Sequence, residues 1–131
     1  IRHYTQGWGN GFNYDIEYWE IWNEPDCVNP NGENPCWQGT NDLFIDFYEV
    51  AAKHLKKEFP HLKIGGPAFT SSWNFEKIRP FLKAVKERNI PLDFYSYIIP
   101  KRHCASELFF FADAKYSSCA LTKFGSTTAP S

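Results

Sequence analysis

A carboxylate and a carboxamide lie side by side at the end of an apolar run. Residues 16–26 read IEYWEIWNEPD, in which β-branched and aromatic residues lead into Asn23, Glu24 and Pro25. A short apolar run of this kind is typical of a strand buried on both faces. Pro25 ends it, because proline has no N–H for a ladder and disfavours the α region for the residue before it. Parallel α/β proteins carry out chemistry at the C-terminal ends of their strands, so Glu24 is the first catalytic candidate.

Proton transfer is the chemistry that Glu24 offers at this place. Partial burial under aromatic rings raises the pKa of a carboxyl group and lets it hold a proton near neutral pH, which a general acid requires. Asp26 is a second carboxylate nearby. Because it follows the strand end by two residues, we expect it to cap or tie down the loop rather than take part in chemistry.

The elements that must position Glu24 repeat as strand and helix at intervals of about thirty residues. Apolar residues three and four apart predict a helix over 40–59, and the same spacing predicts a second helix over 75–88. Pro80 belongs in a first turn, so we expect regular helix to begin near residue 78 or 79, or a kink there. Strands are predicted over 62–68 and 91–97. The order predicts a parallel right-handed βαβαβ unit.

The stretch YWEIWNEPD resembles the fourth-strand signature of clan A glycoside hydrolases, which are retaining (β/α)8 barrels. Its wider context HYTQGWGNGFNYDIEYWEIWNEPD, followed by CWQGT, FPHLKIGGPA and PLDFYSY, is similar to glycoside hydrolase family 39, the β-xylosidase and α-L-iduronidase family. The resemblance covers residues 1–97. It implies that Glu24 is the acid/base and that Asn23 binds the sugar 2-hydroxyl. The fold class that it implies is α/β, as a fragment of a (β/α)8 TIM barrel with about three βα units around strands 4 to 6.

The resemblance also implies a carbohydrate partner, either a xylo-oligosaccharide or another glycoside, and a mechanism without a metal or organic cofactor. Three tryptophans at the strand ends and in the loops beyond them are candidates for shaping the sugar site: Trp22, Trp37 and Trp73. Trp37 lies in a loop rich in Asn, Pro and Gly, where an indole serves equally as a sugar platform or as a plug against the barrel top.

The chain departs from the family pattern after Tyr97. Ile98, Ile99 and Pro100 stand where family members have a His followed by an aromatic residue. We therefore divide the chain into a catalytic-domain piece, 1–97, and an irregular tail, 98–131, predicted to be frameshifted or disordered. Within the tail, the aromatic run 109–111 shows no clear strand partner.

The predicted fragment contains only half of the catalytic pair. A retaining glycosidase needs two carboxyl groups about 5–5.5 Å apart, and no segment resembles the seventh strand that carries the family's nucleophile. The sequence therefore predicts part of a β-xylosidase-like enzyme that is inactive alone. The alternative is a non-catalytic carbohydrate-binding or interaction domain derived from such a barrel, completed by a genuine tail.

Composition excludes several other classes. The chain has 131 residues, a net charge of -1 and no basic block, so nucleic-acid binding has no electrostatic support. No apolar run approaches the ~20 residues of a membrane span. The four cysteines, Cys27, Cys36, Cys104 and Cys119, have neither C-x-x-C nor zinc-finger spacing. Cys27 and Cys36 bracket one loop. They could form a disulfide in an oxidising compartment, but the interpretation that we favour is two free thiols. The sequence indicates neither a compartment nor an oligomeric state.

Overall fold

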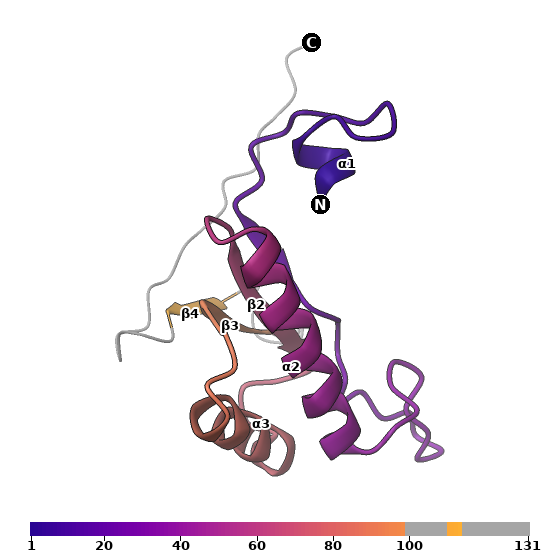
Figure 1. Ribbon diagram of the computed structural model, residues 1–131. Helices are drawn as coiled ribbons and strands as arrows, with labels where there is room; N and C mark the ends of the chain where they lie inside the picture. The colour runs from indigo at the N-terminus through magenta and orange to yellow at the C-terminus, as the bar shows by residue number, and fades with distance from the viewer. Residues whose placement is uncertain (99–109, 114–131) are drawn as a thin grey trace.

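The centre of the molecule is a four-stranded sheet in the order β1-β2-β3-β4. The computed structural model describes residues 1–98 and 110–113 (Figure 1). The strands are β1 (Tyr18–Glu20), β2 (Lys63–Phe69), β3 (Phe94–Tyr97) and β4 (Phe110–Asp113). β1 pairs with β2 and β2 with β3 in parallel. The predicted parallel arrangement of the first three strands is thereby confirmed.

Both crossover connections of the parallel sheet are helical. They are α2 (Asn41–Glu58) between β1 and β2 and α3 (Phe75–Glu87) between β2 and β3, and a short α1 (Arg2–Thr5) precedes them. The ring of Phe81 on α3 contacts Tyr48 on α2 edge to face and also Phe69 on β2. The two long helices therefore cover the same face of the sheet (Figure 1). In the part of the chain that the structure describes, no helix has the length and apolar character of a membrane span.

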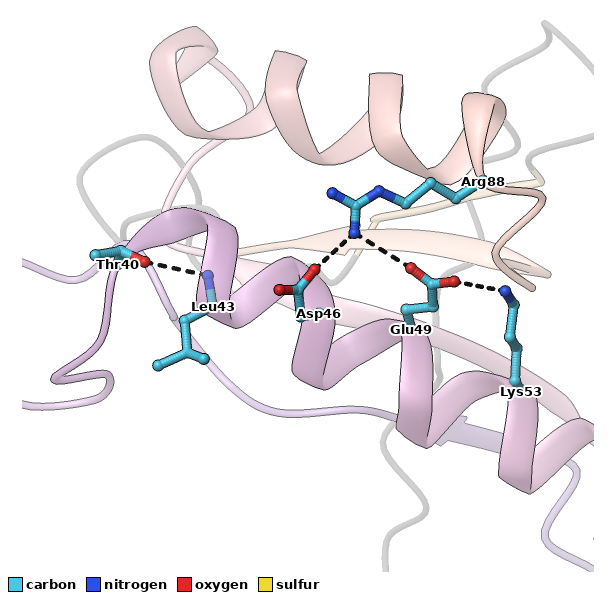
Figure 2. Close-up of polar contacts among 6 residues, drawn as sticks. All are labelled: Thr40, Leu43, Asp46, Glu49, Lys53 and Arg88. Atoms are coloured by element: carbon cyan, nitrogen blue, oxygen red, sulfur yellow. Dashed lines mark hydrogen bonds and ion pairs between the residues drawn. The ribbon is translucent and has the colours of Figure 1, made fainter.

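The α2 helix begins and ends where the sequence predicts. Thr40 is its N-cap and accepts a hydrogen bond from the Leu43 N–H at 3.1 Å, as Figure 2 shows. Phe59 closes the other end by donating its N–H to the Leu55 carbonyl, directly before Pro60. One face of α2 supplies core residues, among them Tyr48, which is fully buried. The N-cap and the apolar face both predict a helix with these bounds, and the prediction is confirmed.

Thr40→Ala is expected to destabilise the folded chain by about 1 kcal/mol, because the Leu43 N–H loses its side-chain acceptor. Urea unfolding followed by far-ultraviolet circular dichroism measures the change. Thr40→Ser keeps the hydroxyl and should retain most of the stability. A Thr40→Ala chain as stable as the parent would show that the cap contributes nothing.

The α3 helix contains Pro80 in its second turn. One expectation from the sequence, that regular helix begins only near residue 78 or 79, is therefore wrong, because the helix begins at Phe75. Pro80 has no N–H to donate to the carbonyl of Glu76. Both residues are exposed, so water can hydrogen bond to that carbonyl and the cost of the missing bond is small.

An exposed ion-pair network joins the two long helices (Figure 2). Arg88, the C-cap of α3, donates to Asp46 at 2.6 Å and to Glu49 at 3.3 Å, and Lys53 donates to Glu49 at 2.5 Å. The hydrogen bonds from Lys53 and Arg88 lower the pKa of Glu49. Because these groups are solvated, we expect the network to orient the two helices relative to each other and to contribute little to the free energy of unfolding.

The strands β2 and β3 approach each other closely at a glycine. A Cβ placed on Gly65 would lie 2.3 Å from the Phe94 carbonyl oxygen and 2.6 Å from the Phe94 ring. Real Cβ atoms do not approach so closely, so only glycine fits here.

A carboxylate fastens the start of β3 to its neighbours. Asp93 accepts hydrogen bonds at 2.9 Å from the Ile64 N–H and from the Lys56 ammonium. Burial acts to raise the pKa of Asp93, but these two donors outweigh it and leave the pKa lowered. Asp93 therefore stays ionised and holds β2, β3 and α2 together at the N-terminal ends of the strands.

The β4 strand differs from the sequence-based expectation. We expected an irregular tail with no partner for its aromatic run, whereas Phe110–Asp113 pairs with β3 in antiparallel fashion. The pairing sets Phe94 opposite Asp113 and Tyr97 opposite Phe110. Strand pairing depends on contacts between distant segments, which a local pattern does not encode. The rest of the predicted tail, 99–109 and 114–131, lies outside the described residues.

Candidate active site

Glu24 lies beside the C-terminal end of β2. Regular β1 ends at Glu20, earlier than Pro25, where the sequence predicts the stop. The Ile21 N–H still donates to Gly65 at 2.9 Å, and the chain then leaves the strand through Trp22 at φ 72°. The Glu24 N–H donates to the Ala68 carbonyl at 3.1 Å, which fixes its backbone against β2.

Three residues at this edge adopt left-handed backbone conformations that non-glycine residues rarely use. They are Trp22 at φ 72°, Glu24 at φ 50° and Ala68 at φ 53°. Such strain persists only where the surrounding structure imposes it, and it gathers at functional sites. Its concentration on Glu24 and on the residue that Glu24 contacts supports the assignment of a functional site to this edge.

Asp26 holds the loops after β1 and β2 together. Its side chain is 4% exposed and accepts hydrogen bonds from the Thr70 N–H at 2.9 Å, the Thr70 hydroxyl at 2.8 Å and the Asn74 amide at 2.7 Å. The expectation that Asp26 ties down a loop is confirmed. The contacts also place the loop that carries Trp73 at the same end of the sheet as Glu24.

Two thiols lie beside Glu24, and sequence reasoning missed this proximity. Cys27 and Cys36 are free and half-buried, in agreement with the free thiols that we favoured. A Glu24 carboxylate oxygen and the two Sγ atoms all lie within 4.8 Å of one another. Burial and the Cys36 thiol, followed by the charges of Glu24 and Asp26, raise the pKa of Cys27. The only sequence signal was that the two cysteines bracket the loop after Glu24.

Trp22 and Trp37 pack together against α2 rather than standing free. Their rings meet edge to face at 5.5 Å, and each also contacts Phe47 of α2. The Trp22 indole N–H donates to the Cys36 carbonyl and that of Trp37 to the Thr40 carbonyl, both at 3.0 Å. For Trp37 this packing favours a structural role, as a plug against the end of the sheet, over a role as a platform on which a sugar stacks.

Asn23 and Trp73 present exposed side chains at the end of the sheet where Glu24 lies. Trp73 is 65% exposed, and its ring has no aromatic partner among residues 1–98. The Asn23 side chain likewise makes no hydrogen bond to the described part of the chain. Both side chains are therefore available to a ligand, whereas the indole N–H groups of Trp22 and Trp37 are already donated to backbone carbonyls.

One hollow, in the loop beyond Glu24, does not include Glu24 in its lining. It has a volume of about 730 Å³ and lies within the loop after β1, between residues such as Asn34, Trp37 and Gln38. A second hollow, of about 600 Å³, lies between the N-terminal segment and the end of α2. Glu24, which is half-buried, lines neither of these two hollows.

Comparison with known proteins identifies relatives over most of the chain. The sequence model described as Glycosyl hydrolases family 39 matches residues 1–123, which extends past Tyr97. A curated β-xylosidase from Geobacillus stearothermophilus is 34% identical over 99 residues, and one from Caldicellulosiruptor saccharolyticus is 29% identical over 97 residues. These alignments cover 73% and 72% of this chain but only 18% of each relative, so the chain spans about a fifth of their length.

A solved structure shares the fold. The crystal structure of a glucosidase from Croceicoccus marinus superposes with a TM-score of 0.58 at 36% sequence identity. The match covers 73% of this chain and 19% of the glucosidase. The parallel strands and their helices therefore correspond to a short portion of a glycosidase.

Proposed function

Because the chain belongs to glycosyl hydrolase family 39, we propose that it forms the acid/base-bearing portion of a retaining glycosidase that cleaves β-xylosides. One observation carries this proposal: Glu24 follows the C-terminal end of β1 by four residues and is bound through its N–H to Ala68 near the C-terminal end of β2. Sequential parallel strands with both helices on one face are also what an arc of a (β/α)8 barrel requires.

In the proposed mechanism, Glu24 acts twice. As an acid it protonates the glycosidic oxygen while a nucleophilic carboxylate attacks the anomeric carbon, so the C–O bond breaks and a glycosyl-enzyme forms. As a carboxylate it then removes a proton from the water that hydrolyses this intermediate. Asn23 binds the sugar 2-hydroxyl, and Trp73, with its free indole face, stacks on the sugar.

The nucleophile must come from a strand beyond the described sheet. Of the carboxylates close to Glu24, Asp26 accepts three hydrogen bonds and is held away from substrate. The later strand would need to bring its carboxyl group within about 5–5.5 Å of Glu24.

The 131-residue chain is expected to release no product from an aryl β-xyloside, because its catalytic pair is incomplete. The measurement is release of the phenolate from purified chain, with the Geobacillus stearothermophilus β-xylosidase as the positive control. Turnover comparable to that enzyme would contradict the assignment of a missing nucleophile.

The coding DNA tests the proposal itself. Translation of all three frames across codons 90–131 and beyond is expected to reveal a His-x-aromatic continuation of β3 and, later, a strand that ends in Glu. If no frame contains these features, the retaining mechanism has no nucleophile and the proposal fails.

The β4 strand favours a second candidate, a carbohydrate-binding domain derived from a glycosidase barrel. An antiparallel strand on the edge of β3 occupies the place where a barrel would continue with a parallel strand. For a binding domain we expect a cooperatively folded monomer that binds xylo-oligosaccharide, with an affinity that survives Glu24→Gln. Calorimetric titration of the chain and of this variant separates the two candidates.

A further inference from the structure

Three potential metal ligands meet beside the end of β1. A carboxylate oxygen of Glu24 and the Sγ atoms of Cys27 and Cys36 lie within 4.8 Å of one another, and all three residues are half-buried. This depth leaves the ligand atoms within reach of an ion from solvent. The spacing E-x-x-C followed by C nine residues later matches no common metal motif, which is why the sequence does not reveal the cluster.

The loop framework holds the two thiols together. The Asn34 side chain donates to the Pro25 carbonyl at 2.7 Å and accepts from the Cys36 N–H at 2.9 Å, so one residue joins the two ends of the loop. The Cys27 N–H donates to the Glu24 carbonyl at 3.1 Å, which closes a tight turn between these ligands. The ligands are therefore positioned before any ion arrives.

We propose that Glu24, Cys27 and Cys36 bind Zn²⁺, with water in the fourth position. Two thiolates and a carboxylate form a donor set that suits this borderline-soft ion, and three protein ligands leave one tetrahedral position open. Zinc takes sulfur at about 2.3 Å and carboxylate oxygen at about 2.0–2.2 Å, so small side-chain rotations complete the site. Binding displaces the two thiol protons into solvent.

Zinc at this site would oppose the proposed catalysis rather than assist it. A Glu24 carboxylate bound to the ion cannot protonate a glycosidic oxygen. The binding itself does not rest on the catalytic role of Glu24, so a failure of the proposed function leaves the zinc proposal standing, and the reverse also holds.

The test uses the 131-residue chain with Cys104→Ser and Cys119→Ser, so that Cys27 and Cys36 are the only thiols. Under a thiol-free reductant, competition with a chromophoric chelator should show one equivalent of Zn²⁺ bound. Cys27→Ser and Cys36→Ser should each lower the affinity by at least about 100-fold, and Glu24→Gln by about tenfold or more, since even outer-shell changes cost about 10–100-fold. Glu33→Gln, an exposed carboxylate of the same loop, is the matched control and should change nothing.

A second readout does not depend on variants that may be misfolded. Cd²⁺ replaces Zn²⁺ at thiolate sites, and its NMR shift and ultraviolet charge-transfer band report the donor set directly. Two sulfurs and one carboxylate are expected. Three results would each overturn the proposal: no bound equivalent of Zn²⁺, an affinity unchanged in Glu24→Gln, or oxidation of the reduced Cys27 and Cys36 thiols in air at the same rate with and without one equivalent of Zn²⁺.

Discussion

Glu24→Gln is expected to lower kcat on xylo-oligosaccharides by about 10²–10⁴-fold in the proposed glycosidase, if an extended reading frame supplies the nucleophile. The amide has nearly the shape of the carboxyl group but neither donates a proton to the leaving oxygen nor accepts one from water. The enzyme for this experiment is expressed from the extended reading frame, and initial rates of sugar release provide the measurement.

The two steps of the mechanism should respond differently to this substitution. An aryl xyloside with a good leaving group needs little protonation, so Glu24→Gln should form the glycosyl-enzyme but hydrolyse it slowly, with a burst of phenolate. Azide, which attacks without losing a proton, should restore turnover. Glu87→Gln, an exposed carboxylate on α3, is the control and should behave as the parent. A rate loss equal on both substrates and without azide rescue would remove Glu24 from the acid/base role.

Asp26→Ala is expected to destabilise the chain by about 2–4 kcal/mol. The substitution leaves the Thr70 N–H, the Thr70 hydroxyl and the Asn74 amide without their acceptor. A hydrogen bond to a charged group contributes about 1.5–3 kcal/mol, although the hydroxyl and the amide can turn to other partners. Because whole domains are stable by only about 5–15 kcal/mol, this loss is large. Urea unfolding measures it.

Two further variants make the Asp26 experiment specific. Asp26→Asn keeps the shape and one acceptor oxygen, so its loss of stability should lie between those of the parent and Asp26→Ala. Asp15→Ala removes an exposed carboxylate before β1 and should be nearly neutral. A loss below about 1 kcal/mol for Asp26→Ala would mean that water replaces the carboxylate and that the loops do not depend on it.

The helices were predictable because several local signals coincide. For α2 the cap at Thr40, the apolar face and Pro60 all give the same bounds. For α3 a single local rule, the position of Pro80, pointed to a late start. Packing of Phe81 against α2 and β2 outweighs the loss of one exposed hydrogen bond.

The candidate site was predictable only in part. The apolar run before Pro25 predicted that Glu24 follows the end of a strand. The position of Asp26 predicted that its side chain ties down a loop. It did not predict the hydrogen-bond donors to Asp26, which are 44 and 48 residues away. The left-handed turn at Trp22 ended β1 early, and a local pattern does not predict that conformation for tryptophan. The meeting of Cys27 and Cys36 depends on the bridge that Asn34 forms across the loop, which spacing alone does not indicate.

The close approach of β2 and β3 has an evolutionary consequence. Every replacement of Gly65 adds a Cβ that would collide with the Phe94 carbonyl, whatever the side chain beyond it. Substitutions in the loops around Glu24 are therefore expected to be tolerated more readily than any substitution of Gly65. A lineage that lost Gly65 would first have to move two strands apart, and with them the strand end to which Glu24 is bound.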